Sequence, residues 1–209
     1  MYKNNKQTIL YPNTDICNNE DFTYHEEEKI YIMKKDNLSI FLPTLCEFIT
    51  IIAKSNSYIK CGNNTKIICG HNCEIDCKNA CTIDCGHNCK IDCGIDCKID
   101  CGIDCKIDCG RDCKINANNY SEISCQSNCT INTEEFSIIK MWHNNTLHCT
   151  NGCVVFGSTH NSVYAKNNCS ITLGDNNNVE VDSDNIIKVG KQTRTIALGS
   201  NNTIVNAIK

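Results

Sequence analysis

The chain has 209 residues, a formal net charge of −4 and 21% charged residues. This length allows one sizeable domain with a small appendage, and the mild acidity argues against nucleic acid as the main partner, because phosphate binding needs a basic stripe. No run approaches the ~18 apolar residues of a membrane span, and the first residues lack the apolar stretch of a secretory signal. Two residue types are unusually frequent, since the chain holds 20 cysteines and 30 asparagines.

Residues 1–45 are predicted to form a small β-rich cap. Residues 28–42 (EKIYIMKKDNLSIFL) contain two apolar runs around the turn residues Lys35, Asp36 and Asn37, which predicts two short strands. The remaining residues, 46–209, are predicted to form a second domain of a different kind, because they follow an eight-residue repeat.

The repeat is most regular after Gly62, which we number position 1. The sixth position is isoleucine, leucine or valine in sixteen consecutive repeats, from Ile67 to Ile187. The register then slips by one residue to Ile196 and resumes at Ile204, which we interpret as a bulge or a loosened turn. The centre of this predicted core ladder is Ile75, Ile83, Ile91, Ile99, Ile107, Ile115, Ile123 and Ile131.

Each repeat is expected to supply one strand and one turn. Positions 4, 6 and 8 are apolar or cysteine and positions 5 and 7 are polar, which is the alternation of a strand with one buried face. Positions 1 to 3 read Gly-x-Asn or Gly-x-Asp, residues that tolerate the left-handed conformations of tight turns. The prediction is an all-β fold, a β-solenoid. We favour two strands and 16 residues per coil over three strands, because isoleucine in mid-strand and cysteine at both ends fit a lens-shaped section.

The cysteines recur at positions 4 and 8 and predict disulfides across each turn. Both members of such a pair are with few exceptions present or absent together, and among the cysteines at positions 4 and 8 only Cys61 and Cys169 lack a cysteine partner. Pairing within a strand is excluded, because four strand residues span ~13 Å and a bridge needs less than about 7 Å. Reduced thiols and metal binding remain alternatives; no metal ligand set or cofactor is predicted, because alternation points the cysteines inward along strands. The predicted bridges are Cys69–Cys73, Cys77–Cys81, Cys85–Cys89, Cys93–Cys97, Cys101–Cys105, Cys109–Cys113, Cys125–Cys129 and Cys149–Cys153.

No nucleophile–base pair, paired carboxylates or phosphate loop stands out, so an enzyme is not expected. The larger aromatic residues gather where the cysteines lapse, and they are the candidate partner surface: Tyr120, Phe136, Trp142, Phe156 and Tyr164. The C-terminal residues 199–209 show no cap, and an open sheet edge predicts homo-oligomers or filaments.

Two resemblances follow from these features. Short coils with internal cysteines resemble the cysteine-stapled β-solenoid antifreeze proteins of beetles, although the outward pairs here read Lys-x-Asp, Glu-x-Asp and Thr-x-Asp instead of Thr-x-Thr. Richness in Asn, Ile, Lys and Asp, tandem repeats and cysteines without an export signal resemble proteins of giant amoeba-infecting DNA viruses, the mimivirus group. That resemblance implies disulfide formation by viral thiol oxidases, and it leads us to expect a rigid virion or surface-fibril component. The alternative is an adhesin-like module that binds glycans or proteins at an extracellular surface.

Overall fold

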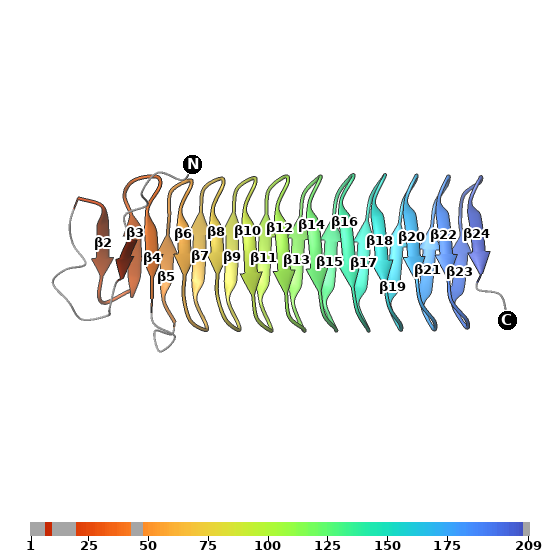
Figure 1. Ribbon diagram of the computed structural model, residues 1–209, viewed down its shortest axis with the longest axis horizontal. Coiled ribbons are helices and arrows are strands. Elements are labelled where there is room, and N and C mark those ends of the chain that lie inside the picture. The colour runs from red at the N-terminus through yellow and green to blue at the C-terminus, as the bar shows by residue number, and fades with distance from the viewer. Residues whose placement is uncertain (1–6, 10–19, 43–47, 207–209) are drawn as a thin grey trace.

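The computed structural model describes residues 7–9, 20–42 and 48–206. These residues form a β-solenoid of about 11 turns without a helix, and none of them forms a helix long and apolar enough to cross a membrane. Figure 1 shows the coils stacked along a rod, from β2 at one end to β23 and β24 at the other. The fold class predicted from the repeat is therefore confirmed.

Two sheets face each other along the rod, and we call them odd and even after the numbers of their strands from β3 onward. The odd sheet contains β2 (Phe22–His25), β3 (Ile30–Met33), β5 (Thr50–Ile52), β7 (Lys66–Cys69), β9 (Thr82–Cys85), β11 (Lys98–Cys101), β13 (Lys114–Ala117), β15 (Thr130–Thr133), β17 (Thr146–Cys149), β19 (Ser162–Ala165), β21 (Asn178–Val181) and β23 (Arg194–Ala197). The even sheet contains β1 (Gln7–Ile9), β4 (Ser39–Phe41), β6 (Tyr58–Lys60), β8 (Glu74–Asp76), β10 (Lys90–Cys93), β12 (Lys106–Cys109), β14 (Glu122–Cys125), β16 (Ile138–Met141), β18 (Val154–Gly157), β20 (Ser170–Leu173), β22 (Ile186–Val189) and β24 (Thr203–Asn206).

From β3 onward, successive strands alternate between the sheets, so one coil contains two strands. Neighbours within a sheet are parallel and 16 residues apart through the regular part of the rod, as in the pairing of Ile91 with Ile107. This spacing confirms two strands per coil. In-register stacking places every position-6 side chain above its equivalent, and Ile75 to Ile131 of the predicted ladder are at most 2% exposed.

The turns owe their shape to position 3. Asn72 has φ 55° and Asp112 has φ 62°, and a positive φ recurs at this position through the solenoid turns. Asparagine and aspartate tolerate this left-handed conformation better than most residues, so the predicted role of the Gly-x-Asn and Gly-x-Asp segments is confirmed. Glycine at position 1 serves a different purpose: a Cβ on Gly110 would lie 2.9 Å from the carbonyl oxygen of Gly94 in the preceding coil.

The N-terminal strands continue the two sheets. β3 pairs in parallel with β5, and β4 pairs in parallel with β6, while β2 is antiparallel to β3. β3 and β4 are the two strands predicted around Lys35–Asn37, but they lie in different sheets. The predicted domain boundary at residue 45 falls within residues 43–47, outside the described residues.

The predicted slip at Ile196 takes a different form. Thr195 pairs with Val179 and occupies the inward position, whereas Ile196 pairs with the outward Glu180. The extra residue lies in the following turn, because Ile187 pairs with Ile204 at a spacing of 17. The strand contains no bulge, and the loosened turn keeps β24 in phase with β22.

Candidate functional site: sulfur columns and an outer groove

Buried cysteines form two columns at the two edges of the rod. Edge 1 comprises the turns that lead from the odd to the even sheet, such as residues 70–72, and edge 2 comprises those that lead back, such as residues 78–80. All eighteen cysteines among the described residues are buried. Column 1 holds Cys69, Cys73, Cys85, Cys89, Cys101, Cys105, Cys149, Cys153 and Cys169, and column 2 holds Cys61, Cys77, Cys81, Cys93, Cys97, Cys109, Cys113, Cys125 and Cys129.

Position 4 is a hydrogen-bond donor site. The thiol of Cys89 donates to the carbonyl oxygen of Gly70, 19 residues earlier, at 3.4 Å. Every position-4 cysteine of the columns makes the equivalent bond, at 3.0–3.4 Å. Where the cysteines lapse, an amide replaces the thiol: Asn145 and Asn161 donate to the same type of carbonyl at 2.9 Å. Where cysteine is absent, position 8 is occupied by apolar residues such as Ala117, Met141 and Leu173, or by Thr133, whose hydroxyl donates to the hydroxyl of Ser137 at 2.9 Å.

The buried asparagines also form a ladder that sequence reasoning missed. The side-chain oxygen of Asn161 accepts hydrogen bonds from the backbone N–H of Asn145 at 2.9 Å and from its amide at 3.2 Å. The backbone N–H of Asn161 in turn donates to Asn177 at 2.7 Å. The signal was present in the sequence, because these three asparagines are spaced by 16 residues at position 4.

The predicted cysteine pairs lie side by side across each turn, but the structure holds them as thiols. Neighbouring cysteines are 3.7–4.0 Å apart, whereas a disulfide bond is about 2.05 Å long. A cysteine of the next coil also lies near such pairs. The sulfur atoms of Cys69, Cys73 and Cys89, for example, all lie within 4.8 Å of one another. The adjacent Cys69 thiol, together with burial, raises the pKa of Cys73 to about 12, and the Cys105 thiol with burial does the same to the pKa of Cys101. These two thiols are therefore protonated and poorly nucleophilic at neutral pH.

The five aromatic residues predicted as one partner surface lie on different sides of the rod. Tyr120 and Phe136 occupy turns of edge 1, where their rings stack at 5.5 Å. Trp142 lies in a turn of edge 2, Phe156 on the outer face of the even sheet, and Tyr164 on the outer face of the odd sheet. Successive strands lie in opposite sheets and successive turns at opposite edges, so proximity in sequence did not predict a shared surface.

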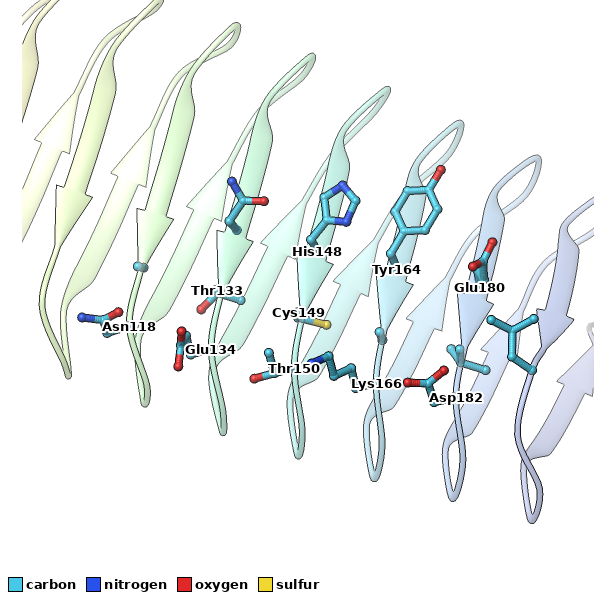
Figure 2. A pocket seen from close by; sticks show the side chains of 15 residues that line it. Asn118, Thr133, Glu134, His148, Cys149, Thr150, Tyr164, Lys166, Glu180 and Asp182 are labelled. Carbon is cyan, nitrogen blue, oxygen red and sulfur yellow. The ribbon is translucent and has the colours of Figure 1, made fainter.

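A shallow groove of about 450 Å³ runs along the odd sheet beside edge 1. The rings of His148 and Tyr164 stack in it with centroids 4.6 Å apart and an interplanar angle of 7°. Figure 2 shows His148, Tyr164 and Glu180 in a row on successive coils, with Thr150, Lys166 and Asp182 in a second row beside them. The groove therefore offers aromatic faces flanked by charged and hydroxyl groups. Of the predicted aromatic residues, it includes only Tyr164.

Comparisons of the chain with protein-family models, with curated proteins and with solved structures found no match. The sulfur columns, the groove and the end of the rod are therefore the features that bear on function.

Proposed function

We propose that this chain is a non-enzymatic, rigid rod that self-associates through its C-terminal end and serves as a virion or surface-fibril component. The observation that carries the proposal is the open end of the solenoid. In the described part of the chain, β23 pairs only with β21, and β24 only with β22. Apolar side chains are exposed beside these edges, including Leu198, Ile204 and Val205. An unpaired edge with apolar neighbours is a template for another strand.

The test of self-association compares two lysine substitutions at outward positions. Val205 in β24 is 50% exposed and Ile186 in β22 is 51% exposed, and Val205 pairs with the outward Lys188, but only Val205 lies on an end strand. Val205→Lys is expected to weaken association at least tenfold, or about 1.4 kcal/mol, because a lysine on an edge strand opposes strand pairing. Light scattering coupled to size-exclusion chromatography over a range of concentrations measures the effect.

Ile186→Lys is the matched control and should assemble like the unmodified chain. An unmodified chain that stays monomeric at every concentration would argue against the proposal, as would equal assembly of the two variants.

We further propose that oxidation converts the eight predicted cross-turn cysteine pairs into disulfide bonds, which stabilise the rod. Each bridge closes a small loop and contributes about 2 kcal/mol in the chain-entropy estimate. Loss of the position-4 thiol proton leaves six of the eight turn carbonyls with a backbone partner, as where the N–H of Gly86 donates to the oxygen of Gly70 at 3.1 Å. Protein purified without reductant should weigh roughly 16 Da less than the reduced chain, two hydrogens for each bridge. An unchanged intact mass would rule the staples out under those conditions.

The groove supports a second candidate function, the binding of an extended glycan. Flat aromatic faces pack against the apolar faces of sugar rings, and the neighbouring polar groups can bind hydroxyls. His148 and Tyr164, together with Lys166 and Asp182, provide both kinds of contact over several coils. This geometry suits a linear chain that lies along the rod.

A glycan array followed by titration of any hit tests this candidate. Tyr164→Ala should weaken binding at least tenfold, because it removes half of the stacked ring pair. Phe156→Ala is the matched control, since Phe156 is similarly exposed but lies on the even sheet. Absence of any hit, or equal losses in the two variants, would remove the groove as a glycan site.

A further inference from the structure

The sulfur atoms of the two columns gather in threes. Each group combines a position-8 cysteine, the position-4 cysteine across its turn and the position-4 cysteine of the following coil. Within each group all sulfur atoms lie within 4.8 Å of one another, and all the residues are buried. The five groups are Cys69/Cys73/Cys89, Cys77/Cys81/Cys97, Cys93/Cys97/Cys113, Cys109/Cys113/Cys129 and Cys149/Cys153/Cys169.

We propose that the reduced columns bind copper(I), with each ion held by the three thiolates of one such triad. Thiolates are soft ligands that select copper(I), zinc or iron–sulfur clusters. Zinc in structural sites takes four ligands in a tetrahedron, whereas copper(I) accepts three thiolates in a plane. The number of ligands favours three, because the described cysteines gather in groups of three whose sulfur atoms lie within 4.8 Å of one another. Neighbouring cysteines are 3.7–4.0 Å apart, a spacing compatible with metal–sulfur bonds of about 2.3 Å, the length found for zinc.

The binding step is an exchange of protons for metal. Each copper(I) ion displaces up to three thiol protons to solvent and forms three metal–sulfur bonds, and no electron is transferred. Two of the displaced protons in each triad come from position-4 thiols that donate to turn carbonyls, such as Cys153 to the oxygen of Glu134 at 3.1 Å. The buried position of the sulfurs excludes water from the site, which protects copper(I) from competing ligands.

Shared residues limit the number of ions. The central triad of column 2 shares Cys97 with the triad before it and Cys113 with the triad after it. Only four of the five triads can therefore be filled at once. The triad Cys149/Cys153/Cys169 shares no residue with the others, so it reports on a single site.

The experiment is a titration of the reduced, oxygen-free chain with copper(I), in competition with a coloured copper(I) chelator of known affinity. Four ions per chain are expected at saturation. Cys149→Ala should bind about one ion fewer, and alanine is tolerated at position 8, where Ala117 and Ala165 stand naturally. Cys125→Ala is the matched control, because Cys125 is also at position 8 but belongs to none of the triads.

A second variant guards against a local folding defect. Cys169→Ser retains a position-4 donor, as at Ser121 and Ser137, and it should also lose about one ion; circular dichroism checks that each variant is folded. Copper K-edge absorption of the loaded chain should show a three-sulfur shell. The proposal is overturned if the chelator keeps all the copper, or if Cys149→Ala and Cys125→Ala bind equal amounts. Neither outcome bears on self-association, which the lysine variants of the end strand test separately.

Discussion

Replacement of Ile107 by alanine is expected to lower the free energy of unfolding by about 2–5 kcal/mol. Ile107 is 1% exposed and lies in register between Ile91 and Ile123 in the middle of the even sheet. The space between the sheets is filled by one isoleucine per strand, so neighbouring coils cannot move in to fill the cavity without breaking register. Urea unfolding of the reduced chain measures the change.

The control for this substitution is Lys98→Ala, on the outer face of β11. It should change stability by no more than about 0.5 kcal/mol, as surface substitutions usually do. Because each coil contacts only its neighbours, the Ile107 variant should also unfold less cooperatively, with a lower dependence on urea. A loss below about 1 kcal/mol for Ile107→Ala would mean that the isoleucine ladder does not supply most of the stability of the core.

Replacement of the buried Asn161 by alanine is expected to destabilise the chain by roughly 3 kcal/mol. The substitution leaves the backbone N–H and the side-chain amide of Asn145 without the oxygen to which they donate, and it removes a donor from the carbonyl of Trp142. Each unsatisfied buried polar group costs about 1–3 kcal/mol. Thermal and urea unfolding measure the loss.

The matched control is Asn132→Ala. The amide of Asn132 also donates along the rod, to the side-chain oxygen of Asn116 at 2.9 Å, but both residues are exposed. Water replaces that bond, so a change below about 0.5 kcal/mol is expected. Equal effects at the two positions would show that the inner asparagine ladder does not replace the sulfur columns in stabilising the C-terminal half.

The sequence predicted the fold because one residue type recurs at one spacing. Isoleucine at position 6 and Asn or Asp at position 3 specify the strand and the turn within each repeat, and the placement of cysteine at both strand ends favoured two strands per coil. These are local properties. Contacts between coils are not local: the triads depend on which residues stack 16 positions apart, and the pairs across single turns do not reveal the third sulfur.

Two further features were beyond the pattern. Thr195 occupies a core position that the spacing of apolar residues assigned to Ile196, because pairing with Val179 keeps the strand in register and transfers the extra residue to the next turn. The aromatic residues at 120–164 are close in sequence, yet the alternation of faces and edges scatters them. The groove around His148 and Tyr164 arises only when six coils are stacked, so no single repeat contains its signature.

The constant coil length makes the rod adjustable in discrete steps. A duplication or deletion of 16 residues would add or remove one coil, about 4.8 Å of length, without disturbing the coils on either side. A change of eight residues would instead exchange the two sheets for everything downstream, so that each outer face and each edge would switch from one set of side chains to the other. The number of repeat pairs that the gene encodes therefore sets the length of the rod. Selection on length acts through insertions of 16 residues, whereas selection on surface chemistry acts through insertions of eight.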